Sequence, residues 1–180
     1  MAEFSDIIRS RRSIRNYEDK AIPDDILNKI LDTAKWTPSW ANTQCWEIVV
    51  VKEPGLKTRL QGAMEKTNPA WKSLAAAPVV LGVCGKLESA GYYKGSVTTK
   101  FGDWFLFDLG LVTQTLCLAA QDEGLGTVIT GLFDHDKAKE VLKVPAGFEL
   151  VSLIPMGYAA KTPSIPKRRE PEEFVHKETF

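Results

Sequence analysis

Histidine is scarce in this sequence, which has only His135 and His176 among its 180 residues. Neither histidine has a serine or cysteine partner in a recognisable arrangement, and no group of residues has metal-ligand spacing. A Walker A loop is absent, and Gly124 and Gly126 form only part of a dinucleotide fingerprint, which precedes a predicted strand instead of a helix. These absences argue against nucleophilic, metal and Rossmann-type chemistry, so a reaction would depend on a bound cofactor.

An excess of charge is also missing, because 23 Lys and Arg balance 23 Asp and Glu. This balance argues against a nucleic-acid partner. Three widely spaced cysteines fit reduced thiols better than a disulfide framework or a zinc site. The longest uncharged stretch in the most apolar segment, 109–121, is too short to span a bilayer, and the first residues do not resemble a signal peptide. We therefore expect a cytoplasmic protein without a membrane segment.

The length and a hydrophobic content of 44% suit a single domain over residues 1–180. Apolar spacing predicts helices that begin at Phe4 and Pro23, helices over 56–64 and 101–123, and a short helix that ends at Leu142. Runs rich in β-branched residues predict strands over 46–51, 78–84, 127–130 and 149–158, and 85–100 is expected to be a long loop. Helices followed by mixed strands and helices indicate an α+β fold.

Two segments suggest contact with a second subunit. The predicted helix 101–123 is apolar almost all round from Trp104 to Val112, apart from Asp108, and such a helix needs cover on every side. The tail, about 161–180, is charged and contains proline, yet it ends in aromatic residues. We expect the tail to pack on the partner subunit.

Three polar segments are candidates for a ligand site. Arginines and a serine in segment 11–15 offer donors that match phosphate oxygens, although the segment could also be a solvated basic patch or a nucleic-acid contact. In segment 37–46, Ser39, Asn42 and Gln44 could bind a ring with donor and acceptor edges, or could form an ordinary polar loop. Segment 166–169, Pro-Lys-Arg-Arg, could also be a solubilising tail.

Together and in this order, these segments resemble the nitroreductase family. The family's opening pattern, Arg-Arg-Ser-hydrophobic-Arg followed by an aromatic, stands at 11–17. Its Pro-Ser-x-x-Asn-x-Gln-Pro-Trp pattern stands at 38–46, with Cys45 in place of the second proline. Residues 108–116 match Asp-x-Gly-x-x-x-Gln-x-Leu, and the glycine-rich turn at 124–131, the strand end at 156–158 and a Lys-x-Arg at 167–169 follow. The resemblance covers nearly the whole chain.

The resemblance implies a nitroreductase-like α+β fold, with a central mixed, mostly antiparallel sheet flanked by helices. It also implies an interlocked homodimer with FMN at the subunit interface. The phosphate of FMN would be held by Arg11, Arg12, Ser13, Arg15, Lys167 and Arg169. The ring and ribityl chain would meet Pro38, Ser39, Trp40, Asn42 and Gln44, partly from the other subunit. Backbone N–H groups of Ile129, Thr130 and Gly131 would approach flavin N5, and Asn68 is a further candidate.

The implied activity is hydride transfer from NADH or NADPH through FMN to a small electron-poor acceptor, such as a nitroaromatic or a quinone, with ping-pong kinetics. No protein side chain is expected to be catalytic, because the flavin carries the chemistry. Trp40 and Tyr92–Tyr93 would either shape the acceptor pocket or only pack. Relatives that share the cofactor site catalyse enone reduction, dehalogenation, azoline oxidation or flavin fragmentation, and a non-enzymatic flavin-binding protein is a further alternative. The identity of the acceptor stays open.

Overall fold

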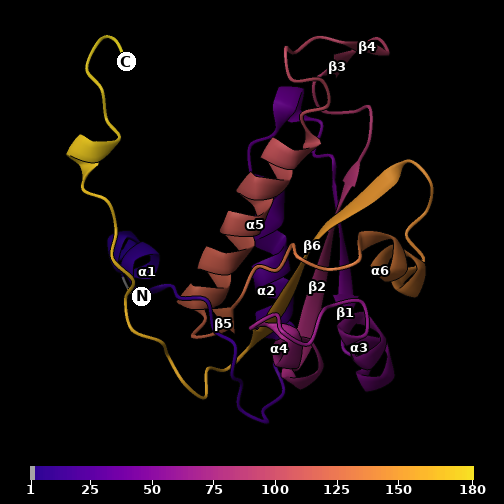
Figure 1. The fold of residues 1–180 in the computed structure, drawn as a ribbon, viewed down its shortest axis with the longest axis vertical. Coiled ribbons are helices and arrows are strands. Elements are labelled where there is room, and N and C mark those ends of the chain that lie inside the picture. Colours follow the sequence, from indigo (N-terminus) through magenta and orange to yellow (C-terminus); the bar gives the residue numbers. More distant parts are fainter. Residues whose placement is uncertain (1–2) are drawn as a thin grey trace.

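The structure, a computed structural model that describes residues 3–180, contains a four-stranded sheet with helices on both faces (Figure 1). The sheet order is β1-β2-β6-β5, and each neighbouring pair is antiparallel. The strands are β1 (Trp46–Val51), β2 (Val79–Lys86), β5 (Gly126–Thr127) and β6 (Phe148–Gly157). The predicted α+β class with a mostly antiparallel sheet is confirmed.

The helices of the described chain differ greatly in length. Helix α5 is the longest, and the three 3-10 helices of the described chain are single turns. The α-helices are α1 (Phe4–Ser10), α2 (Asp24–Thr33), α3 (Pro54–Gln61), α4 (Trp71–Ala76), α5 (Phe105–Asp122) and α6 (His135–Leu142), with the 3-10 turns η1 (Ala34–Trp36), η2 (Trp40–Asn42) and η3 (Pro171–Glu173).

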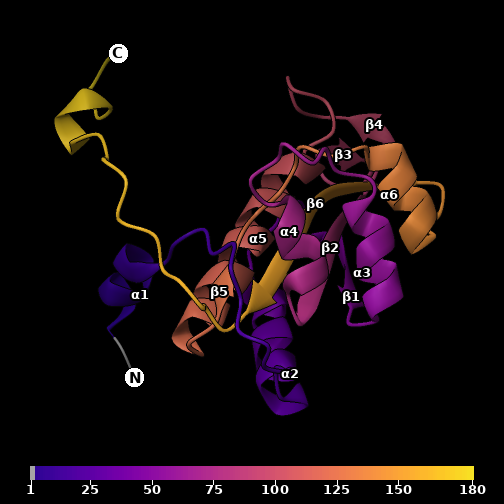
Figure 2. The same ribbon diagram turned by 60° about the horizontal axis from the view of Figure 1, so that its bottom comes forward.

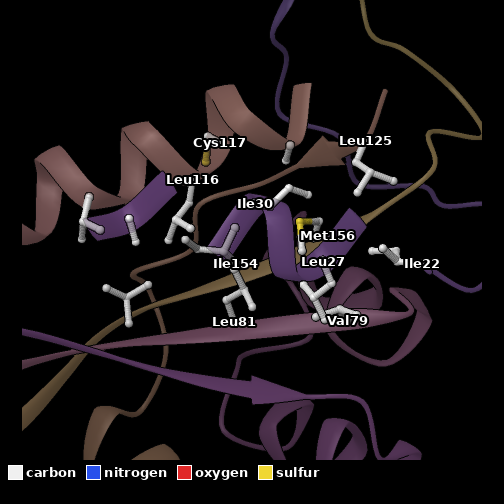
Figure 3. Packing of buried hydrophobic residues seen from close by; sticks show 14 of the residues in the cluster. Ile22, Leu27, Ile30, Val79, Leu81, Leu116, Cys117, Leu125, Ile154 and Met156 are labelled. Carbon is white, nitrogen blue, oxygen red and sulfur yellow. The ribbon is translucent and has the colours of Figure 1, made fainter. Parts of the chain in front are cut away.

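The sheet separates two hydrophobic clusters because successive strand residues point to opposite faces. In β2, Leu81 packs with α2 and α5, and the neighbouring Val80 packs with α3, α4 and α6. Figure 3 shows the first cluster, in which Ile30 of α2 and Leu116 of α5 meet Leu81 and Ile154 of the central strands. Helix α5 is therefore fixed along one face of the sheet, and this placement positions the residues of the candidate site that contact α5.

The sequence prediction fails mainly for short elements. Helix α4 was not predicted, and segment 85–100 is not a plain loop because β3 (Tyr92–Tyr93) and β4 (Ser96–Val97) form a hairpin there. Such short elements contain too few apolar positions to reveal a period. The long helix begins at Phe105 instead of residue 101, because a turn in which the Gly102 N–H bonds to the Thr99 carbonyl precedes it and the Trp104 N–H bonds to the carbonyl of Ala90 at 2.9 Å.

The strand predicted over 127–130 ends at Thr127 in the structure. Beyond it, the chain keeps separate bonds to β6, from the N–H of Val128 to Pro155 and between the backbone groups of Thr130 and Leu153. Residues 129–131 are consequently attached to the sheet only through Thr130, which leaves Ile129 exposed.

The tail from residue 161 to residue 180 is exposed along its whole length. It leaves the end of β6, runs past α1 and ends away from the body of the fold (Figures 1 and 2). Within residues 3–180, no helix combines the length and the apolar character needed to cross a membrane.

Candidate functional site

The arginine segment 11–15 lines a pocket of about 290 Å³ together with the start of the tail. Four guanidinium groups and two hydroxyls meet there, on Arg11, Arg12, Ser13, Arg15, Ser164 and Arg168. Guanidinium groups bind phosphate oxygens in pairs, so this pocket suits a multiply charged anion. We call it the arginine pocket.

Packing against β5 fixes the backbone of the arginine segment. The N–H of Ile14 donates to the carbonyl of Thr127 at 2.8 Å, and Ser13 forms a parallel bridge with Thr127. The side chain of Ile14 is buried directly over Gly126, where an added Cβ would lie 2.3 Å from Ile14 Cγ1. Side chains alternate in extended backbone, so burying Ile14 turns Ser13 and Arg15 toward the pocket.

The members of the arginine segment have different roles. Arg12 is buried, and its Nη1 donates to the carbonyls of Arg9 at 2.5 Å and Arg11 at 2.7 Å, at the C-terminal end of α1. These bonds satisfy carbonyls that a helix end leaves without partners. Arg12 therefore supports the segment as well as lining the pocket, whereas Arg11 and Arg15 have more freedom to bind a ligand.

The predicted C-terminal residues lie differently from Arg168. Lys167 and Arg169 do not line the arginine pocket, although Arg168 between them does. Arg169 instead pairs with Glu173, with Nε and Oε2 3.8 Å apart, and also bonds to the Glu173 carbonyl. Arg168 was not predicted as a ligand contact, because a Lys-x-Arg pattern does not tell which residue of an extended tail faces the pocket.

Segment 129–131 continues from the residue that holds the arginine segment. Both backbone groups of Thr130 bond to Leu153 at 3.0 Å, so its N–H is not available to a ligand. Within the described chain, the N–H groups of Ile129 and Gly131 have no such partner, and they remain as donors. Asn68 lies beside this segment, because its Nδ2 donates to the carbonyl of Leu132 at 3.1 Å.

Ile129 also lines an apolar pocket of about 220 Å³ between α5 and β6. We call this the helix pocket. Its other lining residues come from α5 and β6, and they are Leu106, Leu109, Gly110, Thr113, Gln114, Val151 and Ser152. A concave apolar surface with a few polar groups is the usual form of a small-molecule site. The sequence places these α5 residues in an apolar helix, with Gly110 and Gln114 in a family motif, and none of them was predicted as a site residue.

The predicted ring-binding loop, Pro38–Gln44, is anchored at the first turns of α5. The N–H of Trp40 lies 3.1 and 3.0 Å from the two carboxylate oxygens of Asp108, and Cys45 Sγ lies 3.6 Å from Oδ2. Burial raises the pKa of Asp108 above its ordinary value, and the Trp40 N–H opposes that rise. Burial, with the nearby Asp108 charge, raises the pKa of Cys45 to about 12. Cys45 is thus a protonated donor.

The same loop contains a hydroxyl without a partner. Thr43 Oγ1 is buried, and among the buried side-chain nitrogen and oxygen atoms of residues 3–180 it is the one without a hydrogen bond. Buried polar atoms in native proteins nearly always have a partner, so this hydroxyl is a candidate ligand contact. Sequence analysis named the loop residues on either side of Thr43 and omitted Thr43.

Aromatic side chains surround the anchored loop. The Trp104 ring lies 6.1 Å from the Trp40 ring, 5.8 Å from Phe101 and 5.3 Å from Phe107, measured between centroids. Phe101 and Phe107 are both more than half exposed. The array supports an acceptor-shaping role for Trp40, whereas Tyr93 of the hairpin is largely exposed beside Lys94.

One chain does not bring all the predicted site residues together. The Pro38–Gln44 loop contacts Asp108 near the start of α5, while α1 contacts its end, where Gln121 Nε2 donates to Ser10 Oγ at 3.2 Å. At 1.5 Å per residue, these two points of α5 are about 20 Å apart. The loop and the arginine pocket are therefore separate in one chain. No metal-binding group of three or more His, Cys, Asp or Glu occurs in the described residues.

Comparison with known proteins gives consistent matches. Residues 8–158 match the model of the nitroreductase family. A nitroreductase family protein from Clostridium novyi NT, of known structure, is 31% identical with a TM-score of 0.78, covering 88% of this chain and 86% of that one. NADH dehydrogenase from Thermus thermophilus is 28% identical, covering 92% of this chain and 90% of that protein. Iodotyrosine deiodinase 1 from Homo sapiens is 24% identical, and the match covers 94% of this chain and 66% of that protein.

Proposed function

The chain belongs to the nitroreductase family, and from this premise we propose that it binds FMN and uses NADH or NADPH to reduce a small electron-poor acceptor, such as a nitroaromatic or a quinone. Membership confirms the predicted family and the predicted class of enzyme, an oxidoreductase. One observation carries the proposal: the backbone from Thr127 to Ile129 links the arginine pocket to the helix pocket. A phosphate joined to a planar ring matches that pair of pockets.

Features of this chain fit the two ends of FMN. Arg11, Ser13, Arg15 and Arg168 offer charged and hydroxyl donors to a phosphate. Gly110 supports a ring in the helix pocket, since a Cβ on it would meet no atom within 4 Å and α5 therefore presents an open, flat patch there. When bound, FMN supplies the redox chemistry.

The protein's own contribution is position and electrostatics. Backbone N–H groups of Ile129 and Gly131 would donate to the ring edge, and the guanidinium groups of the arginine pocket would hold the phosphate. The apolar lining of the helix pocket would exclude water from the ring face. Solvent can supply a proton to the acceptor, so the reaction does not require a side-chain acid.

We also propose a homodimer in which the partner supplies the second part of each site. Leu106 and Phe107 of α5, Ile129, and Ile165 and Phe174 of the tail are exposed apolar residues. Exposed apolar surface of this extent is typical of an interface. A second copy would cover it and could bring its Pro38–Gln44 loop to the helix pocket, whereas the loop of the same chain is held on Asp108.

We place the protein in the cytoplasm as part of the same proposal. All three cysteines are free and buried. Thiols without disulfide partners suit a reducing compartment. Cell fractionation with an antibody to the protein would test this placement.

Steady-state kinetics test the proposed reaction. NADH or NADPH oxidation is followed while the concentrations of the reductant and a nitroaromatic or quinone acceptor are both varied. We expect parallel double-reciprocal lines, because reductant and acceptor occupy the same place in turn. Intersecting lines, or no oxidation with any acceptor, would contradict the proposal.

Dehalogenation is the second candidate reaction, because a matched relative is an iodotyrosine deiodinase. Both reactions would use the same cofactor site. Halide release from a halogenated phenol, in the presence of reductant but with no turnover of nitroaromatics, would favour this alternative.

A further inference from the structure

The Pro38–Gln44 loop has an unusual backbone. Ala41, Asn42 and Gln44 have φ values of 42°, 56° and 46°, so three of four consecutive residues adopt the left-handed conformation without being glycine. This conformation is disfavoured for residues with a Cβ, and it persists only where the surroundings impose it. The loop must therefore be held by contacts that outweigh its tendency to relax.

Most hydrogen bonds of the loop join loop residues to each other, so they do not tie its left-handed backbone to the rest of the protein. Ser39 Oγ accepts the N–H of Gln44 at 2.9 Å, and Gln44 Nε2 donates to Asn42 Oδ1 at 3.2 Å. The flanks are tied separately, by Thr37 to Thr115 at 3.0 Å and by the Cys45 carbonyl to the N–H of Lys86 at 2.7 Å.

Asp108 is the residue that fixes the middle of the loop to the rest of the protein. Its carboxylate is 1% exposed and receives the N–H of Trp40 on both oxygens, and the Cys45 thiol faces Oδ2. A charged acceptor makes hydrogen bonds about twice as strong as a neutral one. Helix α5 is itself clamped to the sheet through Leu109, Val112 and Leu116, so the carboxylate is a rigid point.

We propose that Asp108 is a positioning residue, which holds the loop in its left-handed form so that Ser39, Asn42, Thr43 and Gln44 present their polar groups to the ligand. Both carboxylate oxygens of Asp108 are engaged by the Trp40 N–H and the Cys45 thiol, so Asp108 acts on the ligand only through the loop. This inference rests on the proposed function, because it treats the loop as part of the flavin site. The charge and the two acceptor oxygens of the Asp108 side chain are what hold the loop in this geometry.

The test compares Asp108→Asn with the wild type and with Asp122→Asn. Asparagine keeps the size of aspartate but has no charge. It also replaces one acceptor oxygen with an NH₂ group, a donor that would face the donors of Trp40 and Cys45. Asp122 is an exposed residue at the opposite end of α5, so Asp122→Asn is a matched change of charge away from the loop. Amide hydrogen exchange over 38–45 in the protein without flavin reports the loop itself.

In Asp108→Asn, we expect the loop amides to exchange about tenfold faster or more, because a charged hydrogen bond is lost. Exchange in β2 and in the arginine segment should not change. The dissociation constant for FMN should rise about tenfold or more, and the visible circular dichroism of bound FMN should change. A purely structural role would alter thermal stability and leave the spectrum of bound FMN as in the wild type.

Unchanged loop exchange in folded Asp108→Asn would overturn the inference, as would faster exchange with FMN affinity and dichroism equal to the wild type. Failure of the wild type to bind FMN would instead contradict the proposed function. In that case the exchange measurement would still decide whether Asp108 holds the loop.

Discussion

A methyl group added at Gly126 would strike the side chain that anchors the arginine segment. In Gly126→Ala, the new Cβ would lie 2.3 Å from Ile14 Cγ1 and 2.7 Å from Ile14 Cβ. Carbon atoms in contact settle at about 3.5–4.0 Å, so Ile14 must move by more than about 1 Å. Because the Ile14 N–H is bonded to Thr127, a shift of Ile14 also displaces the backbone of its neighbours Ser13 and Arg15.

The displacement has two expected costs. Overpacking of this kind lowers stability by about 1–3 kcal/mol. Loss of one charge-assisted phosphate contact costs about 1.5–3 kcal/mol, which corresponds to a rise of about 10- to 100-fold in the dissociation constant for FMN. Riboflavin has no phosphate, so its affinity should change much less.

The assay is a fluorescence titration of flavin-free protein with FMN and with riboflavin, for the wild type, Gly126→Ala and Gly82→Ala. An added Cβ at Gly82 would lie 2.9 Å from Leu142 Cδ1, on the α6 side of the sheet, so Gly82→Ala controls for overpacking alone. We expect the ratio of riboflavin to FMN dissociation constants to fall only in Gly126→Ala. A ratio equal to that of the wild type would refute the role of Ile14 in placing the phosphate site.

Three further predictions concern the pockets and the thiols. Arg168→Ala should weaken FMN binding by about tenfold, and Lys167→Ala by less, in the same titration; the reverse order would mean that the tail lies differently when FMN is bound. Gly110→Leu should fill the helix pocket and weaken FMN and riboflavin together, and undiminished binding of both would place the ring elsewhere. Burial raises the pKa of Cys45 to about 12 and the pKa of Cys84 to about 11, so about 0.1% or less of either thiol is ionised at pH 8. Both thiols should therefore react with a disulfide reagent only after the protein unfolds. Rapid labelling of the native protein would contradict their burial.

The fold was predictable wherever a segment was long enough to show a pattern. Helix α2 follows its apolar stripe, with Leu27 and Ile30 buried, and β1 matches its run of β-branched residues over 46–51. Helix α4 and the β3–β4 hairpin could not be predicted, because their short runs contain too few apolar positions. The extent of β5 depends on where β6 pairs with it, and such tertiary contacts are not encoded in a local pattern.

The sequence predicted which segments form the candidate site, but it did not predict how they are arranged in space. The arginine segment is held at Thr127, two residues before segment 129–131 begins. Asp108 stood out in the sequence only as an interruption of an apolar helix, and its contact with Trp40 needs the tertiary structure. Gly110 and Gln114 were recognised as parts of a motif, but their place in the helix pocket depends on the packing of α5 against β6.

The dimer remains a prediction with a direct test. Light scattering of the purified protein should give twice the mass of one chain, because the apolar residues of α5 and the tail are exposed in a single copy. A monomer that still holds FMN would contradict the proposal that a partner's loop completes the site.

The visible absorption spectrum of the purified protein, recorded before and after anaerobic addition of NADH or NADPH, decides whether the protein is a flavin-dependent oxidoreductase. We expect flavin absorption bands that bleach when the reductant is added. Absence of flavin bands, even after FMN has been added back and unbound FMN removed, would contradict this expectation.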